Sequence, residues 1–115
     1  MIKGYHKCFG KWSIDGNDKL LLVKDLYPKC VLRKINFEDI SYKRNIKQGI
    51  RYEEADYRYP CLVTEGIKNP DCLRYRLIDG RHRIQKMIDH GFLNGIFFVI
   101  PKEDFLNIYN NTENE

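Results

Sequence analysis

A chain of 115 residues is long enough for one domain with one modest core. Apolar residues make up 43% and aromatic residues 13%, a composition that argues against a disordered chain. The formal net charge of +4 permits a phosphate-bearing partner, but dedicated DNA-binding proteins usually concentrate more basic charge.

The sequence predicts a cytoplasmic protein without a membrane partner. No apolar run approaches the roughly 20 residues of a membrane-spanning helix, and the N-terminal residues lack the apolar segment of a signal peptide. Cys8, Cys30, Cys61 and Cys72 contain no Cys-x-x-Cys pair, which argues against a zinc site. We expect free thiols in a reducing compartment, with Cys61, inside a predicted strand, as the best candidate for a buried one.

The first third of the chain gives mixed signals. Residues 1–16 read as an irregular arm that Phe9 and Trp12 anchor to the body. Residues 19–26 follow turn residues that could cap a helix, but their apolar run could equally form a buried strand, and a proline ends the element in either case. Residues 31–37 contain enough β-forming residues to predict a strand.

Residues 38–58 are the least informative part of the chain. The stretch 44–56 is polar and charged, with widely spaced apolar residues and an interrupting glycine. A helix there is a weak prediction. A solvated face or loop is the stronger one, because charged runs without apolar periodicity are usually solvated.

The second half gives stronger signals. Residues 60–65 predict a strand, and residues 73–78 predict a second strand that returns antiparallel to it after a turn at 69–71. Residues 81–90 have the apolar spacing of a helix. The continuous apolar run 96–100 predicts a strand that is covered on both faces.

The last three of these elements together have the length of a βαβ unit. We therefore expect strands 73–78 and 96–100 to be parallel, with a right-handed crossover. The elements predict a single α/β (α+β) domain over residues 1–109, built on a small mixed sheet with this βαβ unit. A proline then opens a short final helix, and residues 110–115 form a frayed tail.

The turn Asp79-Gly80-Arg81-His82-Arg83 is the one motif with plausible chemistry. Asp79-Gly80 is a turn dipeptide that can also cap the following helix, so the next three residues fall in the first helical turn. Cations are disfavoured there, because a helix N-terminus already carries partial positive charge and unpaired amides. Two arginines and a histidine on such amides form a suitable site for an anion, and phosphate is the obvious one.

The residues of this turn have different expected roles. Gly80 lets the backbone approach a ligand closely. His82 can donate to phosphate or act as an acid or base near neutral pH. Asp79 could orient His82 or an arginine, or help to hold a Mg²⁺ ion that accompanies a nucleotide. The candidate catalytic residues are therefore His82 and Asp79.

The alternative is a surface helix that happens to begin with basic residues, paired to Asp79 or Asp89. Cations at this end of a helix cost only a few tenths of a kcal/mol each, up to ~1. The turn alone therefore does not decide between an anion site and an ion-paired surface.

The segment 77–84, LIDGRHRI, resembles the ParB/sulfiredoxin superfamily, whose members carry a G-x-H-R or G-x-R-R signature after a strand. The following helix, Gly91 and apolar strand agree with that pattern, and Pro60-Cys-Leu-Val63 is similar to the upstream strand of the family. The resemblance covers residues 59–105. It implies a ParB/sulfiredoxin-like domain that binds a nucleotide of the ATP or CTP type, with Mg²⁺ as its companion. Together with Arg81 at the helix start, the phosphate-binding residues are then Gly80, His82 and Arg83.

The chain also departs from the family. Sulfiredoxins carry a catalytic cysteine between the glycine and histidine of the motif, where this chain has Arg81, so we do not expect sulfinic-acid reduction. Chromosome-partitioning ParB proteins have a G-E-R-R-like form and further DNA-binding and dimerisation domains, for which this sequence is too short. Free-serine kinases of the superfamily use an upstream carboxylate as base. The available carboxylates are Glu38, Asp39, Glu53, Glu54 and Asp56.

Three functions follow from these observations. The first is a stand-alone nucleotide-binding domain that acts as a nucleotide hydrolase or phosphotransferase. The second is a nucleic-acid-binding module, ParB-like, nuclease-like or regulatory, that uses basic residues and the tyrosines between residues 42 and 59, although acidic residues among them repel phosphate. The third is a non-enzymatic accessory protein that contacts a protein partner through the same tyrosines.

Overall fold

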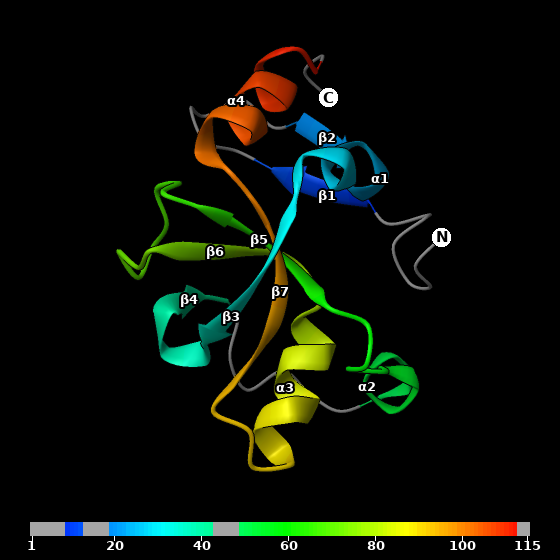
Figure 1. The fold of residues 1–115 in the computed structure, drawn as a ribbon. Coiled ribbons are helices and arrows are strands. Elements are labelled where there is room, and N and C mark those ends of the chain that lie inside the picture. Colours follow the sequence, from blue (N-terminus) through cyan, green and yellow to red (C-terminus); the bar gives the residue numbers. More distant parts are fainter. Residues whose placement is uncertain (1–8, 13–18, 43–48, 113–115) are drawn as a thin grey trace.

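The computed structural model describes residues 9–12, 19–42 and 49–112, and a five-stranded mixed sheet forms its centre (Figure 1). In spatial order, the strands are β3 (Val31–Asn36), β7 (Asn94–Ile100), β5 (Cys61–Glu65), β6 (Tyr75–Asp79) and β4 (Ile40–Ser41). A separate antiparallel pair consists of β1 (Phe9–Trp12) and β2 (Lys19–Leu22). The α+β fold class and the mixed sheet predicted from the sequence are confirmed.

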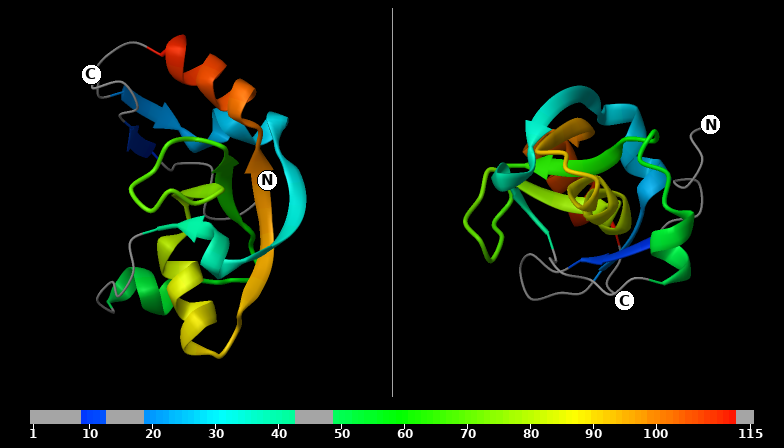
Figure 2. Two further views of the ribbon diagram at one scale, coloured as in Figure 1. Left: turned by 90° about the vertical axis from the view of Figure 1, so that its left-hand side faces the viewer. Right: turned by 90° about the horizontal axis from the view of Figure 1, so that it is seen from below.

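Helices lie at both ends of the sheet. The α-helices are α1 (Val23–Leu26), α2 (Ile50–Glu54), α3 (Arg81–Asp89) and α4 (Lys102–Asn110), and the two short 3-10 turns are η1 (Tyr27–Lys29) and η2 (Phe37–Asp39). In Figure 2, α2 and α3 lie together at one end of the molecule, while α4 and the β1–β2 pair lie at the other end. No helix in the described ranges is long and apolar enough to cross a membrane.

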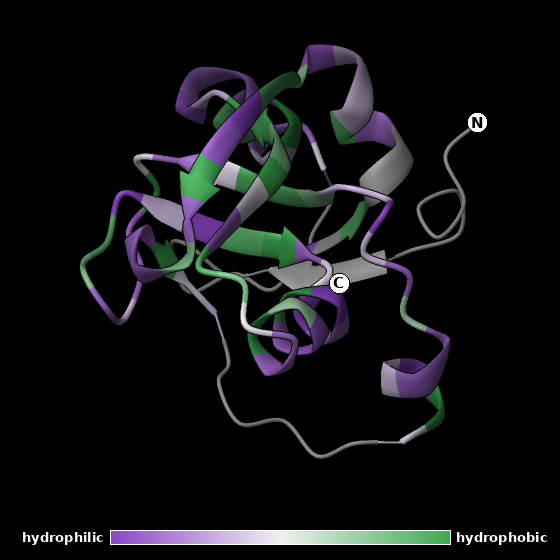
Figure 3. Cartoon of the chain, turned by 60° about the horizontal axis from the view of Figure 1, so that its bottom comes forward, coloured by the Kyte–Doolittle hydropathy of each residue, from purple (hydrophilic) through white to green (hydrophobic). Residues whose placement is uncertain are grey.

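The sheet buries an apolar cluster on each face, because side chains alternate along its central strands. On one face, Cys61 and Phe97 pack with Ile84 of α3. On the other face, Leu62 packs with Phe105 of α4. The apolar strands at the centre of the molecule stand out in green in Figure 3. The two-faced cover predicted for strand 96–100 is confirmed from residue 97 onward, whereas the side chain at its start is half exposed.

The predicted parallel arrangement of strands 73–78 and 96–100 is wrong. β5 lies between β6 and β7; it runs antiparallel to β6 and parallel to β7. β6 and β7 are therefore antiparallel and not adjacent. The hairpin of β5 and β6 forms as predicted, and the connection between the parallel strands β5 and β7 then consists of β6 together with α3 rather than a helix alone.

The first half of the chain contains more regular structure than predicted. Residues 9–12 form β1 rather than an irregular arm, and residues 19–26 form both of the predicted alternatives in succession, β2 and then α1. The predicted strand at 31–37 is confirmed as β3. Of the stretch 44–56, only α2 is helical among the residues described. The proposed anchoring role of the aromatic side chains in residues 1–16 lies outside the described part of the structure, as does the tail beyond residue 112.

Candidate anion-binding site at the start of α3

The backbone of the turn requires glycine at position 80. Gly80 has φ +109°, a left-handed conformation that other residues rarely adopt. A Cβ atom at this position would lie 2.6 Å from Sγ and 2.8 Å from Cβ of Cys61. Gly80 is also the N-cap of α3, and as a glycine it has no side chain that could cap this helix. The N-cap position is therefore Gly80 rather than Asp79, and glycine serves close packing as well as the turn.

Asp79 forms an ion pair instead of a helix cap. Its Oδ2 accepts a hydrogen bond from Nη2 of Arg83 at 2.9 Å. Nη1 of Arg83 also lies 3.4 Å from the carbonyl oxygen of Tyr59 and 3.3 Å from that of Pro60, and it donates to both. Arg83 is only 9% exposed. This arginine therefore ties the turn to the segment before β5, and its ion pair with Asp79 is one of the two weighed as the alternative to anion binding.

Arg81 and His82 remain on the outer side of the turn. Arg81 is exposed and His82 is partly buried. Desolvation lowers the pKa of His82 below its usual 6.5, and the charges of Arg81 and of Arg51 in α2 lower it further. Arginines of two helices, α2 and α3, thus act on the charge of His82. Arg51 was missed by sequence reasoning, because it lies 30 residues away in a stretch whose only signal is its charge.

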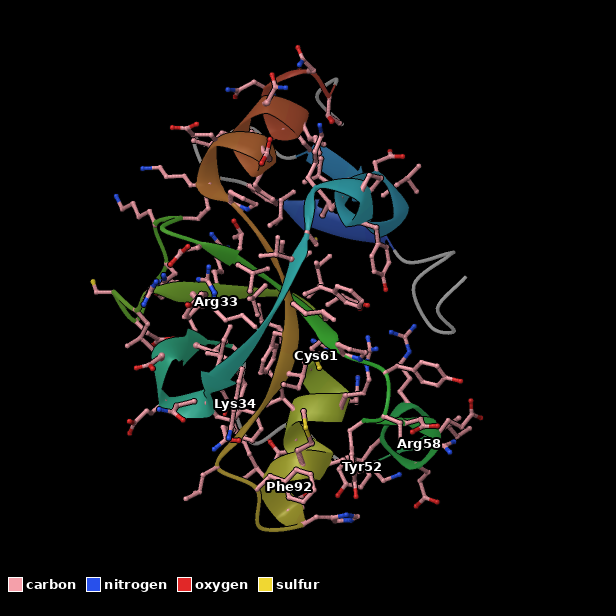
Figure 4. All side chains as sticks on the ribbon, viewed as in Figure 1. Arg33, Lys34, Tyr52, Arg58, Cys61 and Phe92 are labelled. Atoms are coloured by element: carbon pink, nitrogen blue, oxygen red, sulfur yellow. The ribbon has the colours of Figure 1, made fainter. Side chains whose placement is uncertain are left out.

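The position of α2 follows from polar contacts along one side of α3. Nζ of Lys86 donates to the carbonyl oxygens of Glu53 at 3.0 Å and Ala55 at 3.1 Å, at the end of α2. The hydroxyl of Tyr52 donates to Oδ2 of Asp89 at 2.6 Å, and Figure 4 shows Tyr52 between α2 and α3. His82, Lys86 and Asp89 recur at helical spacing and so share one face of α3. The contacts of Lys86 and Asp89 hold α2 along this face, on which His82 also lies.

Aromatic contacts extend this packing beyond the end of α3. We call the contacts that Lys86, Asp89 and His90 make with residues 52–57 the docking surface. The hydroxyl of Tyr57 lies 3.0 Å from Nδ1 of His90, and the two rings meet edge to face. The Tyr57 ring also packs against Phe92 at a centroid distance of 5.3 Å. His90 is exposed, and it contacts the segment that follows α2.

The cysteine closest to the turn is unsuited to nucleophilic chemistry. Cys61 is fully buried, as predicted, and its Sγ lies 3.5 Å from the carbonyl oxygen of Gly80 (Figure 4). Burial raises the pKa of this thiol to about 12, although the charge of Arg83 acts in the opposite direction. The thiol therefore stays protonated near neutral pH. Cys30 and Cys72 are also free thiols.

The five carboxylates considered as a catalytic base do not gather at the turn. Asp56 forms an ion pair with Arg58 at 2.7 Å. The others are exposed on η2 and α2: Glu38, Asp39, Glu53 and Glu54. The charged neighbours that shift the pKa of His82 are both arginines, and none of these carboxylates is among them. In the part of the chain that is described, no group of three His, Cys, Asp or Glu side chains is placed to hold a metal ion.

No family model, curated protein or solved structure matches this chain. The resemblance to the ParB/sulfiredoxin superfamily therefore depends on the motif at 77–84 and on the order of the predicted elements alone.

Proposed function

We propose that this protein binds the phosphate groups of a nucleotide at the start of α3. The observation that carries the proposal is the basic character of the start of α3: the charges of Arg81 and of Arg51, from two helices, both lower the pKa of His82, and the N-cap of α3 is a glycine, which has no side chain to cap the helix. Each cation raises the energy of the unliganded protein, because it lies close to like charge and to the positive end of the helix. A bound anion removes this penalty and accepts hydrogen bonds from the first helical amides.

The roles of the residues differ from those that the family resemblance implies. In this proposal, Arg81 and Arg51 supply charge, His82 donates a hydrogen bond, and Gly80 lets the phosphate approach the backbone. Asp79 and Arg83 maintain the turn through their ion pair, and they act on ligand binding only through the shape of the turn. Mg²⁺ would arrive with the nucleotide, coordinated by its phosphates.

A hydrolase or phosphotransferase activity would require a general base in addition. His82 is the nearest group with the right chemistry, because its lowered pKa favours the neutral imidazole that can accept a proton. The proposal therefore assigns binding to the turn and names His82 as the residue through which any phosphoryl transfer would proceed.

Isothermal titration with ATP, CTP, GTP and ADP in the presence of Mg²⁺ tests the proposal. We expect saturable binding that Arg51→Ala and Arg81→Ala each weaken about tenfold, the loss expected for one charge-assisted hydrogen bond. Arg58→Ala is the matched control, because Arg58 is an exposed arginine of the same segment that pairs with Asp56 instead. Absence of heat with every nucleotide, or equal losses in all three variants, would contradict nucleotide binding at this turn.

The nucleic-acid alternative has less support. Stacking on bases requires available aromatic faces, but Tyr57 packs against His90 and Phe92, and Lys86 lies over the Tyr52 ring at 5.5 Å. A shift with DNA or RNA that weakens steeply with salt would revive this alternative.

A further inference from the structure

Strand β3 is an edge of the sheet with an unusually apolar exposed surface. Its one hydrogen-bonded neighbour among the described strands is β7. Val31 and Leu32 at its start are 52% and 60% exposed, and Ile96 on the neighbouring strand is 50% exposed. Exposed edges of this kind are templates for pairing with another strand, and proteins usually shorten, charge or cover them.

The register shows which of these side chains share a face. Residues opposite each other in an antiparallel pair point to the same side of a sheet. Leu32 lies opposite Phe98 and Lys34 lies opposite Ile96, so these four side chains form one surface on the α4 side of the sheet. We call it the β3 surface. Leu32, Ile96 and Lys34 are exposed and Phe98 is partly buried, so the surface is apolar with a cation at one end.

The opposite face of β3 is engaged within the protein. Nη1 of Arg33 donates to the hydroxyl of Tyr75 at 3.0 Å and lies 3.4 Å from both carboxylate oxygens of Glu65. Figure 4 shows Arg33 and Lys34 on this edge strand. Arg33 is therefore oriented across the sheet, in a cluster with Glu65 and Arg74 whose two arginines and one carboxylate leave one net positive charge on this face, while Lys34 supplies the cation of the other face.

A second copy of the chain fits this edge poorly. Two copies related by a two-fold axis can pair β3 antiparallel only with residues of the same face opposite each other. The two longest such registers place Arg33 opposite Arg33, or Lys34 opposite Lys34. Parallel pairing about a two-fold axis along the strands would place equivalent residues at one level with their side chains on opposite faces, which a continuous sheet does not allow. Like charges directly opposite are destabilising, so the charges of β3 oppose self-association and favour an acidic partner.

We propose that the β3 edge binds an extended segment of another protein as an added strand. Two adjacent aliphatic residues of the segment would lie opposite Val31 and Leu32, and two adjacent acidic residues opposite Arg33 and Lys34. Main-chain pairing supplies affinity in this mode of recognition, and the side-chain pairs supply specificity. The inference is independent of the anion site at α3.

The test uses the full chain and three blocked hexapeptides in amide NMR titrations, at peptide concentrations on the order of 1 mM. The acidic peptide is acetyl-Thr-Glu-Glu-Val-Val-Thr-amide, the second carries Lys in place of both Glu, and the third is the acidic peptide N-methylated at alternate residues. We expect the acidic peptide alone to shift and protect the amides of residues 31–36. Leu32→Ser and Lys34→Glu should each weaken binding about fivefold, whereas Ile50→Ser, which removes a still more exposed aliphatic side chain from α2, should have no effect.

Three outcomes would overturn the proposal. The first is no protection of β3 by the acidic peptide. The second is equal binding of the basic peptide, which would show that charge does not contribute, or equal binding of the N-methylated peptide, which would show that main-chain pairing does not contribute. The third is a concentration-dependent dimer that Leu32→Ser abolishes in sedimentation measurements, because the occupant of the edge would then be a second copy of the chain.

Discussion

Each end of α3 has a glycine in the left-handed conformation, but the two glycines are packed differently. Gly80 before the helix and Gly91 after it both have left-handed φ angles, +109° and +88°. At the end of the helix, Gly91 and Phe92 donate to the carbonyl oxygens of Ile88 and Met87, the pattern of a Schellman cap, and a Cβ atom on Gly91 would meet open space. At the start, Gly80 lies against a buried thiol.

This difference shows which part of the helix is built for more than local folding. At the C-terminal end, carbonyl oxygens of the last turn accept hydrogen bonds from the backbone amides of His90, Gly91 and Phe92. The N-terminal end has a glycine as its N-cap, which supplies no capping side chain, and the charges of Arg81 and Arg51 both act on His82 there. A fold that needed only to begin a helix would use a serine, threonine or aspartate cap without accumulating like charge.

The largest expected effect comes from the glycines themselves. Gly80→Ala should lower the free energy of unfolding by about 3 kcal/mol, the sum of left-handed strain and the clash with Cys61. Gly91→Ala should cost only about 1 kcal/mol, because strain is its single penalty. Urea denaturation of both variants measures the difference. Equal losses would show that the two ends of α3 are packed alike.

The second prediction separates the two arginines of the turn. Arg83→Met should destabilise the protein by about 3 kcal/mol, because it leaves the Asp79 carboxylate without its buried partner. Arg81→Met, on the exposed side, should leave stability nearly unchanged. The double variant Asp79→Asn/Arg83→Met should recover part of the loss in thermal unfolding. A large loss in Arg81→Met would contradict the division of roles.

The third prediction concerns pH, with sulfate as a probe that does not titrate near neutrality. Because the folded pKa of His82 lies below its unfolded value of 6.5, the unliganded protein should lose stability as the pH falls below about 6.5. A bound anion raises this pKa, so binding takes up a proton and sulfate should bind more tightly as the pH falls. Calorimetric titrations across this range measure the dependence, and His82→Gln should flatten it. A slope that persists in His82→Gln would assign the proton to another group.

The smallest expected effect comes from the docking of α2. Tyr52→Phe removes the hydrogen bond to Asp89 at the far end of α3 from the site. Since the contact is exposed, stability should change little. Anion affinity should fall about twofold, because Arg51 is then held less firmly beside His82. Titration of Tyr52→Phe next to Tyr57→Phe, whose hydroxyl contacts His90, tells whether one contact or the whole docking surface positions Arg51.

Much of the second half of the fold could be predicted from the sequence. The strand, turn, helix and strand from residue 73 to residue 100 lie close to where apolar periodicity placed them, with α4 after the expected proline. The predicted parallel direction of β6 and β7 is wrong. Periodicity reports which residues are buried within an element, but it carries no information about whether a third strand inserts between two others.

The candidate site, like the fold, could be predicted from the sequence only in part. The residues at the start of α3 could be named from the sequence, since basic charge in the first turn of a helix can be recognised locally. The pairing of Arg83 with Asp79 was one of several open alternatives, and it depended on the carbonyl oxygens of the segment before β5. Arg51 could not be predicted, because no local pattern in α2 indicates which part of α3 it contacts.

The sequence by itself determined the limits of α3, because left-handed glycines and a helical apolar stripe are properties of the chain within a few residues. Only the tertiary structure decided the strand order, the burial of Arg83 against the segment before β5, and which arginine of α2 acts on the charge of His82. These features depend on contacts between residues 20 or more positions apart, and their energies come from burial and charge that no short stretch of sequence contains.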